Sequence, residues 1–193
     1  MITRDRCGWC EGSELYELYH DNEWGVPLYD ENRLFEFLLL EGAQAGLSWI
    51  TVLNKRENYR EAMDGFNAEK IAAYGEVKKQ QLLRNSGIIR NRLKIDSAIK
   101  NASAFLEFEH KEIGFADFLW SFVDHKPVQN CFRNLDEVPV STAASEAMSK
   151  ALKKLGFNFV GETICYAFMQ ATGMVNDHLV TCYRREDCMD LAG

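Results

Sequence analysis

The chain has 193 residues, 47% of them hydrophobic, which is enough for one substantial core without stabilising cross-links. Its formal net charge of −7 argues against a protein that coats nucleic acid or membrane by bulk charge, although a local basic face remains compatible with it. Because the N-terminal residues are not a typical leader and no apolar run reaches about 18 residues, we expect neither a signal peptide nor a membrane span. We expect the six cysteines to be free or metal-bound in a reducing cytoplasm.

Apolar residues recur at three- and four-residue spacing along most of the chain, and only three prolines interrupt it, so the pattern predicts an all-α fold. We expect Asp30 to cap the second helix, and Ser141 or Thr142 to cap the helix that begins near Ala143. The expected helices cover residues 13–20, 31–42, 48–63, 68–73, 76–84, 89–108, 114–122, 143–155 and 160–173.

Aromatic residues are concentrated near the N-terminus. Tyr16 and Tyr19 are three residues apart in an expected helix, and Trp9, Trp24 and Trp49 flank them. Residues at this spacing lie near one another on a helix surface. Such stripes usually belong to a core, but tyrosine and tryptophan beside an acid also supply the stacking faces and the hydrogen-bonding edge that a purine pocket requires. The pattern leaves both interpretations open.

The stretch from Leu34 to Leu40 is apolar on nearly every side, which predicts a buried central helix. Glu41 follows directly, where the core should continue, and a carboxylate there requires a partner or a ligand unless it lies at a solvent-facing helix end. Gly46 favours a tight turn close to another backbone or a ligand. The neighbouring Leu47 is either a core residue or an exposed wedge.

Residues 78–100 carry seven lysines and arginines against one acid, Asp96, and are therefore opposite in charge to the chain as a whole. Within this basic segment, we expect residues 82–92 to form a helix, a short hairpin at Gly87 and a second helix. Such a hairpin exposes backbone N–H groups at a helix N-terminus, which can hold a phosphate without reading base sequence. An ordinary helical corner with a solvated basic face fits the same pattern.

Two cysteines and two histidines lie near the ends of the chain, as Cys7 and His20 and then as His178 and Cys182. Two thiolates and two imidazoles form a full tetrahedral set for zinc, so one ion would join the termini. The second pair lies at i and i+4, on one face if residues 174–182 are helical. Standard zinc-finger spacings are absent, and four unrelated residues are the alternative, because buried cysteines and lone histidines are common.

Several segments of unusual composition resemble the DNA-3-methyladenine glycosylase I family, bacterial repair enzymes of the helix-hairpin-helix superfamily. The likeness covers nearly the whole chain. The matching segments are RCGW (6–9), YHDNEWGVP (19–27), LEG (40–42), QAGLSWITVL (44–53), KRENYR (55–60), GIIR (87–90), GETICY (161–166) and VNDH (175–178).

The resemblance implies a fold of the helix-hairpin-helix DNA glycosylase type, as a single domain over residues 1–193 with two lobes. Residues of about 1–30 and 160–193 would form one lobe around a zinc ion, and the central helices would form the other, with the hairpin near 82–92. The partner would be double-stranded DNA that contains 3-methyladenine, and the protein would be a monomer with no membrane association.

The resemblance also implies roles for individual residues. Glu41 would be the catalytic residue and, with Tyr16, would hydrogen-bond the excised base. Trp49 and Tyr19 would stack on the base, and Trp9 would complete the aromatic wall. Further residues would contact DNA, namely Gly46 and Leu47 at the lesion and Gly87, Ile88 and Arg90 at a phosphate. One structural zinc ion would be held by Cys7, His20, His178 and Cys182.

The expected reaction is hydrolytic excision of 3-methyladenine without strand cleavage. Methylation at position 3 puts positive charge on the base, so the glycosidic bond breaks toward a neutral leaving group and little acid catalysis is needed. Accordingly, no aspartate occurs between Ser97 and Asp117, downstream of the hairpin, where related glycosylases place one. Two alternatives are a zinc metallohydrolase with an open metal position and a DNA-binding module without catalysis.

Overall fold

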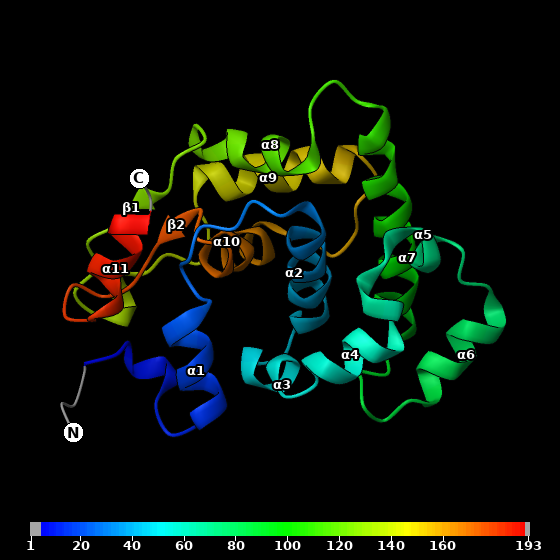
Figure 1. The fold of residues 1–193 in the computed structure, drawn as a ribbon, viewed down its shortest axis with the longest axis horizontal. Coiled ribbons are helices and arrows are strands. Elements are labelled where there is room, and N and C mark those ends of the chain that lie inside the picture. Colours follow the sequence, from blue (N-terminus) through cyan, green and yellow to red (C-terminus); the bar gives the residue numbers. More distant parts are fainter. Residues whose placement is uncertain (1–4, 192–193) are drawn as a thin grey trace.

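The centre of the molecule is helix α2 (Glu31–Gln44), in a computed structural model that describes residues 5–191 (Figure 1). Every residue from Leu34 to Ala43 is buried, which confirms the predicted central helix. The helix begins where expected, because the Asp30 carboxylate accepts a hydrogen bond from the backbone N–H of Arg33 at 2.8 Å.

The described residues form ten further α-helices. Helix α2 packs against α3, α7, α8 and α10, while α5 packs against α7 and α9 against α10. These helices are α1 (Glu14–Asn22), α3 (Trp49–Leu53), α4 (Arg56–Ala62), α5 (Ala68–Ala72), α6 (Glu76–Arg84), α7 (Arg92–Leu106), α8 (Phe115–Trp120), α9 (Ala143–Lys154), α10 (Glu162–Ala171) and α11 (Arg184–Leu191). Short 3-10 helices are η1 (Gly8–Cys10), η2 (Asp64–Phe66), η3 (Glu107–His110), η4 (Ser121–Val123) and η5 (Leu135–Glu137).

The described chain is mostly helical, as predicted, but it also contains a small parallel sheet. Strand β1 (Val128–Gln129) pairs with β2 (Val175–Asn176), with Val128 opposite Val175. The condition under which His178 and Cys182 would share one helical face, a helix over residues 174–182, is therefore not met. The backbone there bonds to residues 128–130 instead of to its own preceding turn, and residues 177–183 contain no helix.

Two helix boundaries differ from the sequence prediction. The predicted helix over 48–63 is split into α3 and α4, because the backbone leaves helical geometry at Lys55, which has φ −108° and ψ 0°. The helix predicted from residue 89 begins only at Arg92, because Asn91 takes an extended conformation and its side chain caps the N–H of Lys94. Thr142, rather than Ser141, caps α9 through a reciprocal pair of bonds with Ser145.

The two ends of the described chain lie together. In Figure 1, α1, α11 and the two strands gather at one end of the molecule, while α5, α6 and α7 form the other. The N–H of Tyr183 donates to the carbonyl of Asp5 at 3.1 Å. Helix α11, which the sequence analysis did not predict, packs near β2 and buries Cys188. Within residues 5–191, every helix is too short or too polar to cross a bilayer.

Candidate functional site

A cavity of about 380 Å³ lies between α1, α2, α3 and α10. This size is within the range of sites that enclose a small ligand. Its wall brings together Trp9, Tyr16, Tyr19, Glu41 and Trp49, so all five residues that the sequence analysis assigned to a base pocket line one space. The other lining residues are Trp24, Gln44, Leu135, Val138, Pro139, Val140, Thr163, Tyr166, Ala167, Gln170 and Asp177.

The carboxylate of Glu41 is buried and incompletely satisfied. Its side chain is 2% exposed, and within the described residues Oε2 has no hydrogen-bond partner. Burial raises the pKa of this carboxyl to about 8, because the charged form is desolvated. A solvent-facing position for Glu41 is thereby excluded. An unpartnered acid at a cavity wall is poised for a ligand that brings a donor or a positive charge.

Aromatic rings form the walls around this carboxylate. The Tyr19 and Trp49 rings are 5.4 Å apart between centroids, and the Trp9 and Tyr16 rings are 4.8 Å apart. The indole Nε1 of Trp49 is buried and also lacks a partner within the described chain. Burial raises the pKa of both tyrosines, so their hydroxyls stay protonated and can donate hydrogen bonds. The cavity therefore offers flat apolar faces together with unused polar groups.

A second buried acid in the cavity wall was not assigned a role from the sequence. Asp177 accepts hydrogen bonds from the Tyr166 hydroxyl at 2.6 Å, from Gln170 at 2.9 Å and from Asn130 at 2.7 Å. All three donors are neutral, so they add no positive charge to this side of the cavity. The only sequence signal was the position of Asp177 inside the VNDH segment. Its partners are up to 47 residues away, and only the fold reveals them.

The segment over residues 135–140 was also missed. Leu135, Val138, Pro139 and Val140 line the cavity, and Val140 is 75% exposed. The segment contains the short helix η5 and connects β1 to α9. It has no helical or strand periodicity, which explains why pattern analysis did not find it.

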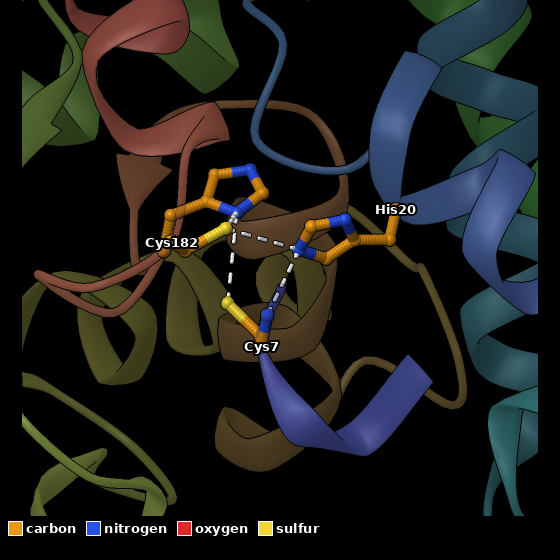
Figure 2. A group of neighbouring side chains, drawn as sticks. Cys7, His20 and Cys182 are labelled. Carbon is orange, nitrogen blue, oxygen red and sulfur yellow. Dashed lines mark hydrogen bonds between the residues drawn. The ribbon is translucent and has the colours of Figure 1, made fainter. Parts of the chain in front are cut away.

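Cys7, His20, His178 and Cys182 converge at the joined ends of the chain. Figure 2 shows Cys7 before α1, His20 on α1 and Cys182 in the C-terminal segment with their polar atoms turned toward one another. All four residues are buried, and their ligand atoms lie within 4.8 Å of one another. The Cys182 sulfur is 3.4 Å from the Nδ1 of His178 and 3.4 Å from the Nε2 of His20.

These separations suit a metal ion. Tetrahedral zinc, with bonds of about 2.3 Å to sulfur and about 2.0 Å to nitrogen, requires sulfur–nitrogen distances of roughly 3.5 Å. A third sulfur–nitrogen separation, from the Cys7 sulfur to the Nδ1 of His178, is 3.7 Å. The buried set of two thiols and two imidazoles can therefore hold a metal ion.

The remaining ring nitrogens of the cluster have partners of their own. The Nδ1 of His20 lies 2.8 Å from the carboxylate of Asp21, which forms a bidentate pair with Arg6. The hydrogen bonds from Arg6 and His20 outweigh burial and lower the pKa of Asp21. The Nε2 of His178 lies 3.1 Å from the carbonyl of Trp24. Metal-binding histidines are usually oriented in this way, with the second nitrogen on a carboxylate or a carbonyl.

The cluster supports one wall of the cavity. The Trp24 ring packs edge-on against His178, with 4.6 Å between centroids, and Trp9 packs against His20 at 5.4 Å. Gly25, with φ +78°, allows this approach, because a Cβ there would lie 2.9 Å from the Nε2 of His178. Since Trp9 and Trp24 also line the cavity, movement within the cluster would be transmitted to the cavity wall.

The predicted turn at Gly46 and Leu47 lies at the end of α2, between Glu41 and Trp49. Ala45 has φ −41° and ψ 116°, Gly46 has φ +78°, and the N–H of Leu47 donates to the carbonyl of Gln44, as in a type II turn. The Leu47 side chain is 42% exposed, so it is not a core residue. The sequence alternative of an exposed wedge fits this geometry.

The hairpin over residues 85–91 connects α6 to α7. Three of its backbone N–H groups already have partners inside the protein. Gly87 donates to the Asn85 side chain, Ile88 to the Asn85 carbonyl and Ile89 to the Tyr59 hydroxyl. The Ile88 side chain is buried, so only its backbone can reach a partner. The helix N-terminus that the sequence predicted after the hairpin is the start of α7, where the first intrahelical bond is donated by the N–H of Ile95. The Asn91 side chain caps the N–H of Lys94, which leaves the N–H groups of Arg92 and Leu93 before that bond.

Part of the basic segment is neutralised by the fold. Lys78 pairs with Asp64 at 3.0 Å, Lys79 with Asp96 at 2.8 Å and Arg92 with Glu76 at 3.2 Å. Three basic residues of this segment remain exposed and have no ion pair with another described residue, namely Arg84, Arg90 and Lys100.

Comparison with known proteins gives consistent matches. A family model described as methyladenine glycosylase matches residues 9–185. A curated relative from Escherichia coli (strain K12), DNA-3-methyladenine glycosylase 1, is 56% identical over 92% of this chain and 95% of its own length. A crystal structure of a 3-methyladenine DNA glycosylase I is 56% identical and superposes with a TM-score of 0.91, covering 93% of this chain and 98% of the other.

A further solved structure, a Tyr-to-Phe variant of a 3-methyladenine DNA glycosylase I in complex with 3-methyladenine, is 33% identical and superposes with a TM-score of 0.89. It covers 93% of this chain and 97% of the other. The fold and these matches place the chain among the DNA glycosylases, which hydrolyse N-glycosyl bonds. More narrowly, the chain belongs to the methyladenine glycosylase family.

Proposed function

We propose that this protein extracts 3-methyladenine from alkylated duplex DNA and hydrolyses its N-glycosyl bond, leaving the strand uncut. The observation that supports this most strongly is the unpartnered carboxylate of Glu41, which faces a cavity walled by aromatic rings. A cationic purine is complementary to this cavity. Its positive charge and its hydrogen-bond donor match the carboxylate, and its two flat faces match the aromatic walls.

Base recognition divides between stacking and edge contacts. Tyr19 and Trp49 offer the faces against which the ring stacks, and Trp9 closes the wall. The Tyr16 hydroxyl donates a hydrogen bond to the base, while Glu41 accepts one from the exocyclic amine. Ordinary adenine lacks the positive charge, so it would leave the desolvated acid uncompensated and bind less well.

The chemical step follows from the charge of the damaged base. Water adds to the anomeric carbon as the glycosidic bond breaks, and the electron pair of that bond goes to the ring nitrogen and neutralises the departing 3-methyladenine. The added water loses one proton to solvent. Because the leaving group departs neutral, no general acid is required. When the cationic nucleotide occupies the cavity, its charge lowers the pKa of Glu41 from about 8, and the resulting carboxylate stabilises positive charge that spreads onto the sugar. No lysine acts as a nucleophile, so the strand stays intact.

DNA contacts would come from two surfaces. The exposed Leu47, after Gly46, enters the base stack at the lesion and fills the space that the extruded nucleotide leaves. Helix α6, the hairpin at Gly87 and Ile88, and helix α7 act as a helix-hairpin-helix motif at the backbone, with a phosphate bound by the first N–H groups of α7 and by Arg90. The role of the hairpin itself is to position these groups.

We propose that Cys7, His20, His178 and Cys182 bind one structural zinc ion. Four protein ligands leave no position for a catalytic water, so bound zinc would act as a cross-link between the chain ends and not as a Lewis acid. The role of the ion is thus to hold Trp9 and Trp24 in the cavity wall. A metallohydrolase would require an open ligand position instead.

We further propose that the chain acts as one glycosylase domain and as a monomer in the cytoplasm. Its two lobes would be the terminal segments of about 1–30 and 160–193 and the central helices, and residues 1–4 and 192–193 of these segments lie outside the described residues. Two observations support this arrangement, the joined chain ends and the six cysteines, all of which are free.

The deciding experiment is incubation of the protein with methylated duplex DNA, followed by chromatographic identification of the free bases. We expect release of 3-methyladenine and no strand break before alkaline treatment. Absence of released base would favour a DNA-binding module without catalysis. Trapping of a covalent DNA adduct with borohydride would contradict hydrolysis by water and would indicate an amine nucleophile.

A further inference from the structure

A lysine of the basic segment contacts the backbone at the end of α2 instead of facing solvent. The Lys94 ammonium, on the first turn of α7, donates to the carbonyl of Ala43 at 2.7 Å and to that of Ala45 at 2.8 Å. The side chain is half-buried, and the resulting desolvation lowers its pKa. Lys94 is therefore occupied inside the protein and does not belong to the free positive charge around the hairpin.

The two acceptor carbonyls, of Ala43 and Ala45, lie at the C-terminal end of α2. Carbonyls in the last turn of a helix have no intrahelical donor, and the negative end of the helix dipole favours a cation there. Ala45 is also the first central residue of the turn that presents Leu47. The ammonium thus binds the end of α2 and the exposed turn at the same time.

The other end of this link is the hairpin. Asn91 ends the hairpin and caps the N–H of Lys94, so the backbone of Lys94 is fixed to the hairpin while its side chain is fixed to the turn. The hairpin is held in turn by Lys55, whose ammonium lies 2.9 Å from the carbonyl of Ser86. Hairpin and turn are consequently joined by a short path through a single side chain.

We infer that Lys94 is a positioning residue that sets the place of the Leu47 turn relative to the phosphate-binding hairpin, so that anchoring of the backbone delivers Leu47 into the base stack. The inference rests on the proposed function and extends it to a residue that touches neither base nor phosphate. It requires both carbonyl contacts, because one contact alone would leave the turn free to rotate about the end of α2.

Two simpler roles would explain the same lysine. As a phosphate ligand, Lys94 would contribute to the salt dependence of DNA affinity by about one unit of slope. As a general support of the fold, it would affect the cavity as much as the turn. The cavity has independent support, since Trp49 packs against Tyr19 and Phe37.

The test compares Lys94→Met with the wild-type protein and with Lys100→Met. Lys100 is exposed, lies on the same helix and has no side-chain hydrogen bond or ion pair among the described residues, so its substitution removes the same charge without breaking such a bond. The readouts are the single-turnover rate of 3-methyladenine release from duplex DNA, the affinity for free 3-methyladenine from tryptophan fluorescence, and the slope of log affinity for duplex DNA against log salt concentration.

We expect Lys94→Met to slow release from duplex DNA by about 10- to 100-fold, as misplacement of a positioning group typically does. Its affinity for the free base and its salt slope should stay near wild-type values, and Lys100→Met should leave the release rate unchanged. Lys94→Gln retains one donor and should give an intermediate rate, which keeps the test decisive if the methionine variant does not fold.

Three results would overturn the inference. These are equal release rates for the Lys94 and Lys100 variants, a loss of free-base affinity in parallel with the rate in Lys94→Gln, and a fall of about one in the salt slope. If the wild-type protein itself released no base, the proposed function would fail and the inference would fail with it. An active wild-type enzyme with unchanged Lys94 variants would contradict the inference alone.

Discussion

The cluster of Cys7, His20, His178 and Cys182 and the cavity are adjacent buried sites, and they differ in how their polar atoms are satisfied. In the cluster, the nitrogens that face away from the ligand set are bound to Asp21 and to the carbonyl of Trp24. In the cavity, the Oε2 of Glu41 and the Nε1 of Trp49 have no partner within the described residues. A buried polar atom without a partner destabilises a fold by about 1–3 kcal/mol unless something else compensates it.

This difference is what we expect between a site that stabilises the fold and a site that binds a ligand. The outward-facing histidine nitrogens of the cluster all have hydrogen-bond partners, as in a structural site. The cavity has unsatisfied polar atoms that a ligand with a donor or a positive charge would satisfy. The two sites are nevertheless mechanically connected through Trp9 and Trp24. The following experiments sharpen or break this comparison.

The largest effect should come from the cluster. Cys182→Ala removes a ligand, and we expect loss of bound zinc together with destabilisation on the order of 5 kcal/mol, or a fall in Tm of about 10–20 °C. Cys131→Ala, at an exposed cysteine outside the cluster, is the matched control. Metal content and calorimetric melting measure the outcome. A Cys182→Ala protein that lacks metal but melts like the wild type would show that the cluster is not structural.

In the cavity, Glu41→Gln keeps the shape of the side chain and removes the charge. We expect release of 3-methyladenine to slow by about 100-fold, while affinity for duplex DNA with an abasic analogue changes by less than about threefold. Glu69→Gln, at an exposed glutamate, controls for the loss of one negative charge. Single-turnover kinetics and equilibrium binding provide the two numbers. Full activity in Glu41→Gln would exclude this carboxylate from the reaction.

The stability of the protein should reveal the raised pKa of Glu41. Its pKa is about 8 in the folded protein and near 4.5 when unfolded, so the folded state binds more protons between these values. The contribution of Glu41 to the free energy of unfolding is therefore most favourable below pH 4.5, and it decreases as the pH rises toward 8. The free energy of unfolding of Glu41→Gln, relative to that of the wild type, should therefore increase by a few kcal/mol from pH 5 to pH 8.

Chemical denaturation of the two proteins at both pH values measures this difference. The comparison with Glu41→Gln cancels the pH dependence of the metal ligands, which both proteins share. A constant difference across the range would show that Glu41 is ionised in the empty cavity and that the contrast with the cluster is smaller than proposed.

The smallest effect concerns the hairpin. Arg90→Met should weaken affinity for undamaged duplex DNA by a few-fold at about 0.1 M salt and should lower the salt slope by about one. Lys126→Met removes an exposed charge near β1 and should change neither quantity. Fluorescence anisotropy across a salt series gives both values. An unchanged slope for Arg90→Met would remove this residue from the phosphate contact.

Much of the local structure could be predicted from sequence because it depends on neighbouring residues. The burial of Leu34–Leu40 followed from a run with no polar face, and the cap at Asp30 followed from a residue type with a strong preference for that position. The single helix predicted over 48–63 was wrong because helical periodicity continues across Lys55, whose side chain instead binds the distant Ser86 carbonyl.

The sequence by itself determined the helical class, the central helix and the residue types that a purine pocket and a zinc site require. These depend on composition and on spacing within one or two helical turns. The tertiary structure decided which of these residues meet. It left Glu41 without a partner, gave Asp177 its three donors and joined Lys94 to the Leu47 turn, because each of these outcomes depends on contacts between segments far apart in the chain.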